Sequence, residues 1–288
     1  MSSNPQFDFA KSFGRKSGGR RVSPLSITVG ILVAVAIALV SLSGFYADWL
    51  WYKSVDYTSV WSTTLFTKIY LFIGFGLITS LFVLLNVYLA FRRRPVYVSM
   101  VVENDNLERY RAQLEPLRKV AFAGVGLAVF YFAGTAGTSL WRTWLLFKNS
   151  TDFGVKDVQF NLDISFFAFR LPFWQSLISW GFSALILAIL ASGAVHYLYG
   201  GLRPQMRQDR TTPFARAQLS VLLGLFVLLK GVAYWFDRYA LSLKENKLIT
   251  GLTYSDVNAL LPAKAILAGI AVICSLLFFA NIFRKSWF

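Results

Sequence analysis

Residues 25–46 read LSITVGILVAVAIALVSLSGFY, an apolar stretch without a charged side chain. A bilayer core is about 30 Å thick, so an α-helix needs roughly 20 apolar residues to cross it. Lipid offers no hydrogen-bond partner to exposed backbone groups, which makes a helix the favoured form for such a stretch. A basic segment that includes Lys11 and Arg21 precedes it, as in a secretory signal. Because the apolar run is longer than the about 7–15 residues of a signal peptide's apolar part, we interpret it as a retained membrane anchor.

Five further apolar stretches of similar length follow the first one. They lie at about residues 64–91, 120–140, 171–199, 217–236 and 260–283. The composition agrees with a membrane protein, since 56% of the residues are hydrophobic and 15% are charged, against about 45–50% and about 25% in soluble proteins. The predicted fold class is therefore an all-α integral membrane protein, with a six-helix transmembrane bundle over residues 25–283.

The distribution of Lys and Arg predicts how the chain is threaded. One side would hold both termini and the loops 92–119 and 200–216, and it gathers more than twice as many Lys and Arg as the other side. Cytoplasmic loops collect these cations. We therefore predict that both termini are cytoplasmic, with a disordered basic tail at 1–24 and a short end at 284–288. The net charge of +15 is then mostly a topology signal, and nucleic acid is not a predicted partner.

Two features stand out in the predicted outer loops. Polar and apolar residues alternate from Asp157 to Phe166, which predicts a short extended segment that lies on the helix ends or offers an edge to a partner. Most of the tryptophans also fall at predicted outer ends, and the usual interpretation is an interfacial belt. The alternative is an aromatic platform on which outer loops pack against each other or against another domain. The tryptophans concerned are Trp49, Trp51, Trp61, Trp141, Trp144, Trp174 and Trp235.

The predicted cytoplasmic loop 92–119 has a helical pattern. Apolar residues recur at helical spacing from Leu107 to Leu117, which predicts an interfacial helix. Arg92, Arg93 and Arg94 precede it. These three arginines are candidates for contact with anionic lipid headgroups, and the alternative is that they act only as a topological stop signal.

Ionisable groups inside a span are costly and therefore candidates for function. Lys230 is the deepest of them, and it lies about two helical turns from Asp237 on nearly the same face. Lys230, Asp237 and Arg238 are candidates to line a path for an anionic solute or lipid headgroup. The alternative is that Lys230 reaches the outer interface on its long stem or pairs with a carboxylate. Lys68 and Lys264 lie near outer ends and are expected to reach the interface.

The residues that usually carry chemistry are scarce in this sequence. The chain has one Cys, Cys274, and one His, His196, which excludes disulfide frameworks and sites built from several imidazoles. A proton relay at His196 would need a second titrating group, and no Asp or Glu lies inside a span, so His196 is expected to be structural. The motifs GxxxxGK, GxSxG and HExxH do not occur. We therefore predict no enzyme activity, no cofactor and no metal site.

Several loop segments together resemble a known family. They are 49–57 (WLWYKSVDY), 153–163 (FGVKDVQFNLD), 169–173 (FRLPF), 234–239 (YWFDRY), 254–257 (YSDV) and 261–263 (LPA). In these segments the chain resembles uncharacterised protein family 0182, a family of large bacterial multi-spanning membrane proteins. The resemblance covers about residues 25–285 and implies a multi-pass protein of the bacterial plasma membrane. It also implies that members continue into a seventh span and a large extracytoplasmic region, so this chain resembles their N-terminal membrane portion.

The resemblance brings no agreed activity, so function is predicted from the loops and the cations. The first hypothesis is a non-catalytic membrane module that anchors or organises extracytoplasmic partners through its outer loops. The alternative is a transporter or channel-like protein for an anionic solute or lipid, using Lys230 and the Asp237/Arg238 region. The expected partners are membrane lipids and other membrane or envelope proteins.

Overall fold

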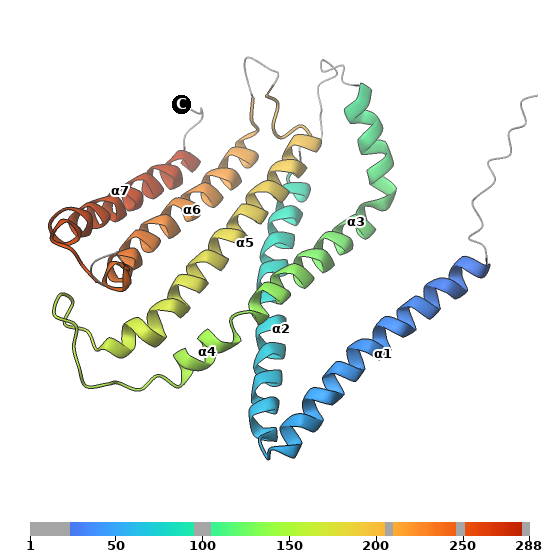
Figure 1. Ribbon diagram of the computed structural model, residues 1–288. Coiled ribbons are helices and arrows are strands. Elements are labelled where there is room, and N and C mark those ends of the chain that lie inside the picture. Colours follow the sequence, from blue (N-terminus) through green and yellow to red (C-terminus); the bar gives the residue numbers. More distant parts are fainter. Residues whose placement is uncertain (1–23, 95–104, 205–209, 246–250, 284–288) are drawn as a thin grey trace, which may run out of the picture. The chain divides into compact units, whose positions relative to one another are not determined.

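The computed structural model describes residues 24–94, 105–204, 210–245 and 251–283 (Figure 1). The predicted basic tail up to residue 23 and the predicted end at 284–288 lie outside the described residues. Seven α-helices form within the described ranges: α1 (Pro24–Ser54), α2 (Thr58–Arg92), α3 (Asp105–Thr138), α4 (Trp141–Lys148), α5 (Leu171–Leu198), α6 (Pro213–Ala240) and α7 (Leu261–Ala280).

The prediction of an all-helical chain is confirmed for the residues that the structure describes. They contain no β-strand, and six of their helices are long and apolar enough to cross a membrane. The exception is α4, which is only 8 residues long. Two short π-helical turns, Phe166–Arg170 and Asp256–Leu260, run directly into α5 and α7. Both of these helices have a proline in the first turn, Pro172 and Pro262, and a widened turn relieves the clash of a proline ring with the preceding turn.

The chain divides into two compact units, residues 1–63 and 64–288. The described part of the first unit is α1 and the beginning of α2. Between these helices the backbone of Asp56 adopts a left-handed φ of 61°, and the Tyr57 N–H donates to the Tyr52 carbonyl at 2.9 Å. The rings of Phe45 and Trp61 pack beside this turn with centroids 5.0 Å apart.

In the second unit, α2 and α3 approach closely because each places glycines against the other. A Cβ built on Gly76 would lie 2.8 Å from the Phe130 carbonyl oxygen, and one built on Gly134 would lie 2.9 Å from the Phe72 carbonyl oxygen. Ser80 adds a hydrogen bond across this interface, donating to the Gly126 carbonyl at 2.9 Å. Small residues with hydroxyl hydrogen bonds are the usual means of packing helices in lipid, where burial of apolar surface gives no net gain.

Helices α5, α6 and α7 lie side by side in chain order (Figure 1). A buried apolar cluster joins α2, α5 and α6 through Val83, Leu185, Ala188 and Leu222. Ser275 of α7 donates to the carbonyl of Gly224 in α6 at 2.8 Å. The second unit is therefore a bundle in which α2 contacts both α3 and the α5–α6 pair.

The extended segment predicted over Asp157–Phe166 is wrong. An isolated antiparallel bridge joins Lys156 to Asp163, and the chain between them folds back as a turn. Asn161 has a left-handed φ of 54°, and the Asp157 N–H donates to the Leu162 carbonyl at 2.8 Å. The alternation of polar and apolar residues gave a wrong prediction because Asp and Asn side chains bind nearby backbone groups and thereby favour turns over strands.

The residues predicted as an interfacial helix in the 92–119 loop are helical but do not form a separate element. They are the first turns of α3, which begins at Asp105 and runs on to Thr138. Pro116 lies inside this helix, and α3 is visibly bent (Figure 1). A proline inside a helix removes one hydrogen bond and kinks the axis.

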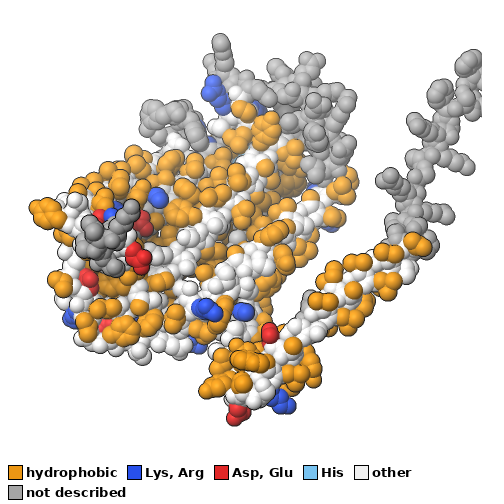
Figure 2. Space-filling view, in the orientation of Figure 1, with side chains coloured by type: hydrophobic (Ala, Val, Ile, Leu, Met, Phe, Trp, Pro, Cys, Tyr) orange, Lys and Arg blue, Asp and Glu red, His pale blue; other side chains and the backbone are white. Residues whose placement is uncertain are grey.

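Hydrophobic side chains dominate the visible surface (Figure 2). Large apolar residues on the helices remain mostly exposed, for example Leu81 at 64%, Leu190 at 64% and Leu277 at 65%. Exposed apolar area of this extent is typical of a surface that contacts lipid or protein rather than water. Six long apolar helices with such a surface suggest a multi-pass membrane protein.

The second unit has two ends of different chemistry. At the arginine-rich end, α2 ends, α3 begins, α5 ends and α6 begins, and this end carries Arg92, Arg93, Arg94, Arg118, Arg203 and Arg216. At the opposite end, which we call the loop end, α4 and the segments 149–165 and 251–255 connect the helices.

Candidate functional site

Aromatic side chains at the loop end form a packed layer. The rings of Phe147 in α4 and Phe173 in α5 stack with centroids 4.3 Å apart. Trp144 joins them at 5.3 Å from Phe173, and Trp174 lies 6.0 Å from Phe236 of α6. The layer therefore joins three helices, and Trp144 and Trp174 pack on neighbouring rings.

The loop 149–165 packs against the edge of this aromatic layer at α6. Phe160 and Phe166 both contact Tyr239 of α6, with ring centroids 4.9 and 5.4 Å apart. Asp152 accepts a hydrogen bond from the Ser165 hydroxyl at 3.1 Å and pairs with Arg170 at 3.6 Å. The loop is therefore held against the helix ends by rings on one side and polar contacts on the other.

Asp163 is the centre of this loop's polar contacts. Its carboxylate accepts backbone N–H bonds from Phe153 at 3.0 Å, Gly154 at 2.9 Å and Ser165 at 2.8 Å. These hydrogen bonds, that from Phe153 first, favour the ionised form and lower the pKa of Asp163 from 3.8 to about 2. The structural role explains why a carboxylate stands here.

We expect Asp163→Asn to loosen the loop, because an amide has one acceptor oxygen where the carboxylate has two. Limited proteolysis at neutral pH should cut within residues 149–165 faster in this variant than in the wild type, and Asp48→Asn, at an exposed α1 carboxylate, should change nothing there. The pKa of Asp163 is lowered in the folded chain, so its stabilising contribution is present above about pH 4 and is lost as the pH falls toward about 2. Wild-type loop protection, followed by hydrogen exchange, should therefore persist at pH 4; equal protection of wild type and variant would contradict this role.

A second carboxylate fixes the segment before α7. Asp256 is only 1% exposed, and it accepts hydrogen bonds from the backbone and hydroxyl of Thr253 at 2.9 and 2.7 Å. Lys244 donates to its other oxygen at 3.1 Å. The two loop-end segments are thus both built around an Asp that accepts local hydrogen bonds, and exposed apolar residues remain at their surfaces, Val158 at 101% and Tyr254 at 84%.

The three residues predicted to line an anion path each have a different neighbour. Lys230 is exposed, with its ammonium 4.7 Å from the Tyr234 ring centre. Asp237 pairs with Lys264 of α7 at 3.2 Å. The guanidinium of Arg238 lies 4.5 Å over the Trp235 ring. The structure therefore places Lys230, Asp237 and Arg238 along α6 without joining them into one site.

The other two lysines in the spans each have a defined neighbour. Lys264 bridges α7 and α6 through its pair with Asp237. Lys68 lies 5.3 Å from the ring centre of Trp141.

A buried polar network holds the arginine-rich end together. His196 of α5 is 2% exposed, and its Nε2 lies 2.9 Å from Oε1 of Gln218 in α6. The Gln218 amide nitrogen lies 2.9 Å from the Asn86 carbonyl oxygen and 3.2 Å from Oδ1 of Asn86 in α2. Three helices are therefore joined through one glutamine, and His196 has the kind of structural partner expected for it.

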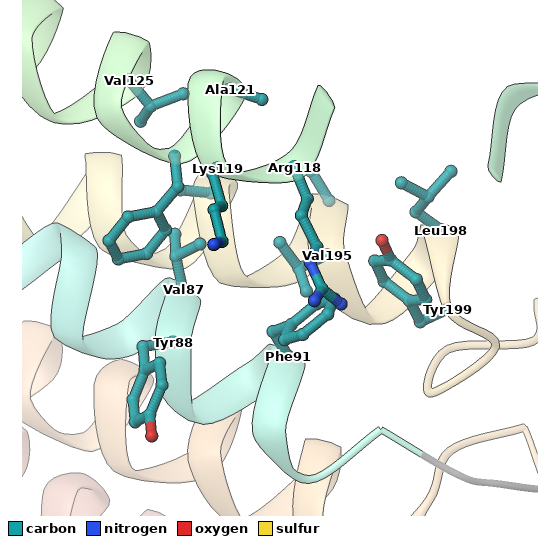
Figure 3. Close-up of a pocket in the computed structure, with 13 residues that line it drawn as sticks. Val87, Tyr88, Phe91, Arg118, Lys119, Ala121, Val125, Val195, Leu198 and Tyr199 are labelled. Carbon is teal, nitrogen blue, oxygen red and sulfur yellow. The ribbon is translucent and has the colours of Figure 1, made fainter. Parts of the chain in front are cut away.

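A groove of about 580 Å³ lies beside this network, between α3 and α5 with α2 as its floor (Figure 3). Its walls are apolar, and Arg118 and Lys119 of α3 lie at its rim. Arg94 stacks on two rings of the groove, 4.4 Å from the Phe91 centre and 5.0 Å from the Tyr199 centre. A second groove of about 800 Å³ follows the same two helices toward the loop end and includes Ser176, Ser179 and Ser183.

The three arginines predicted to contact lipid each have a different neighbour in the structure. Arg94 lies at the groove, Arg93 is 5.9 Å from the Phe214 ring of α6, and Arg92 donates to the Tyr88 hydroxyl at 3.4 Å. The sequence interpretation missed Arg118 and Lys119, although their position directly before an apolar run was a visible signal. It also missed Gln218 and Asn86, which are polar but uncharged residues inside predicted spans.

Comparisons with known proteins place this chain in a family. Residues 25–288 match the Uncharacterised protein family (UPF0182). A UPF0182 protein of Streptomyces coelicolor is 49% identical over 279 residues, which is 95% of this chain and 28% of the relative. A UPF0182 protein of Thermobifida fusca is 44% identical over 267 residues, 92% of this chain and 26% of the relative. The chain thus spans less than a third of the length of these relatives, and no solved structure shows a significant match.

Proposed function

The chain belongs to the uncharacterised protein family UPF0182, and we propose that it is a non-catalytic membrane module that anchors or organises extracytoplasmic partners. The observation that supports this is the order of the loop end. Packed rings and two hydrogen-bonded carboxylates fix its segments, and these segments carry exposed apolar side chains. A scaffold that holds Val158 and Tyr254 in place suits the docking of another protein surface.

The partner we propose is an extracytoplasmic protein region. In the Streptomyces coelicolor relative the matched segment is 28% of the chain, so most of that protein lies outside it. A membrane part with a preformed loop end is a suitable support for such a region. Lys230 is exposed and does not line either groove, so no specific observation favours the transport alternative.

The proposed orientation places the loop end outside the cytoplasm, and thiol labelling tests it. On a Cys274→Ser background, Val158→Cys should react with a membrane-impermeant maleimide in intact cells, since Val158 is fully exposed. Arg92→Cys, at the opposite end, should react only after the membrane is permeabilised. The reverse pattern would contradict the orientation and with it the anchoring role.

The partner is tested by photo-crosslinking in cells, with the crosslinker placed at Val158 or at Tyr254. We expect crosslinked peptides from one defined extracytoplasmic protein region, found at both positions. The matched control is Leu190, which is also highly exposed but lies within α5; it should give no such peptide. Crosslinks to phospholipid alone at Val158 and Tyr254 would mean that the loop end is an interfacial belt and would overturn the proposal.

A further inference from the structure

The groove at the arginine-rich end combines two kinds of chemistry that the anchoring role does not use. Figure 3 shows Arg118 and Lys119 extending from α3 toward α2, with the Arg118 guanidinium beside Phe91. Behind them, Val195 and Leu198 of α5 form an apolar wall. We propose that this groove binds an anionic phospholipid, with its phosphate at Arg118 and Lys119 and an acyl chain along the apolar walls.

The charge at the rim favours an anion. Glu115 is the carboxylate that pairs with the cations here, at 3.4 Å from Arg94 and 4.0 Å from Arg118. Among the residues that the structure describes, no carboxylate pairs with Lys119. Among the side chains that the structure describes, three cations therefore face one acid, and the surplus positive charge is available to a phosphate.

The rings under the rim strengthen this preference. Phe91 lies 4.4 Å below the Arg94 guanidinium and 6.0 Å from that of Arg118. A guanidinium over a ring can still donate hydrogen bonds in its own plane, as Arg94 does to Glu115 at 3.4 Å. These ring contacts hold the two arginine side chains at the opening of the groove, so that they do not extend into solvent.

The position of the two cations along α3 matches the headgroup level of a membrane. Arg118 and Lys119 lie in the first turn or two of the part of α3, Glu115–Thr138, that is long and apolar enough to cross a membrane. Basic side chains at such a position lie at the headgroup level of the membrane. A phosphate bound there would have its acyl chains directed along the helices, toward the groove walls.

The volume and lining of the groove argue for a lipid over a small soluble anion. A volume of about 580 Å³ is within the range of about 300–1,000 Å³ of ligand sites, and far more than a phosphate needs. The second groove, of about 800 Å³, lies further along the same helices, in the direction in which an acyl chain would extend. An apolar protein helix lying in the groove would fill the apolar part but would leave the surplus positive charge uncompensated.

The test is lipid binding by the purified full chain in nonionic detergent, measured by native mass spectrometry. We expect phosphatidylglycerol to be retained well above phosphatidylcholine of the same acyl chains. The double variant Arg118→Gln/Lys119→Gln should weaken phosphatidylglycerol binding roughly 30-fold, and it should weaken phosphatidylcholine, whose choline cation offsets the phosphate charge, much less. Ala194→Trp, which fills the groove from α5, should weaken the binding of both lipids.

The matched control is Arg93→Gln, which removes one cation from the same end but away from the groove. It should leave binding as in the wild type. If the double variant does not fold, Lys119→Met, at a cation without an ion pair among the described residues, should weaken phosphatidylglycerol much more than phosphatidylcholine. Equal retention of both lipids, displacement of phosphatidylglycerol by soluble glycerol phosphate, or an equal loss in Arg93→Gln would overturn the proposal.

Discussion

Gly134→Leu is expected to lower the stability of the helical bundle by about 2 kcal/mol or more, which is the usual cost of overpacking. A Cβ at this position would lie 2.8 Å from the Phe72 ring and 2.9 Å from the Phe72 carbonyl oxygen. The ring can rotate, but the carbonyl belongs to the α2 backbone, so α2 and α3 would have to separate. Thermal unfolding in detergent, followed by Trp fluorescence, should show a midpoint lower by about 5 °C.

Two further variants isolate the cause of this effect. Gly124→Leu adds the same side chain to the same helix, at a position with no atom within 4 Å of the built Cβ, and should be nearly neutral. Phe72→Ala combined with Gly134→Leu should remain unstable, because the carbonyl oxygen stays in place. Full recovery in that double variant would show that the ring alone made the contact tight, and the close backbone approach would lose its support.

The helices were predictable because their signal is local and strong. An apolar run such as residues 25–46 or 260–283 is long enough to decide its own structure in lipid. The close approach of α2 and α3 was less visible, since Gly74 and Gly124, with open space around them, look the same in sequence as Gly76 and Gly134. The two kinds of glycine differ only in their distance from the point where α2 and α3 cross, which the sequence does not show.

The site residues were harder to predict because their partners are distant in sequence. Gln218 contacts Asn86 across 132 positions, and nothing in either segment indicates the other. Lys230 attracted a functional hypothesis because an ionisable group in a span is costly, yet its side chain is exposed beside Tyr234. The alternation at Asp157–Phe166 failed for a different reason, since it treats Asp163 as a solvent-facing strand residue, whereas its carboxylate accepts backbone hydrogen bonds within its own loop.

Gln218→Leu is expected to destabilise the bundle about as much as the glycine substitution between α2 and α3. Leucine has a similar size but removes the partners of His196 and Asn86, both of which are buried. A buried polar group left without its partner costs about 1–3 kcal/mol in soluble proteins, while hydrogen bonds between membrane helices average about 0.6 kcal/mol. Because three contacts are lost together, we expect a loss of about 2 kcal/mol, measured as the shift in thermal unfolding in detergent.

A double-mutant cycle distinguishes the network from simple packing. If His196 and Gln218 act through their 2.9 Å contact, His196→Ala and Gln218→Ala should be non-additive by about 1 kcal/mol. Gln175→Leu, at a half-buried glutamine that lines the second groove, should cost less than about 0.5 kcal/mol. Additive costs for His196 and Gln218 would mean that each is held by its own surroundings. Since α2, α5 and α6 meet at Gln218, a coupled result would also explain how the floor and the α5 wall of the neighbouring groove are held in register.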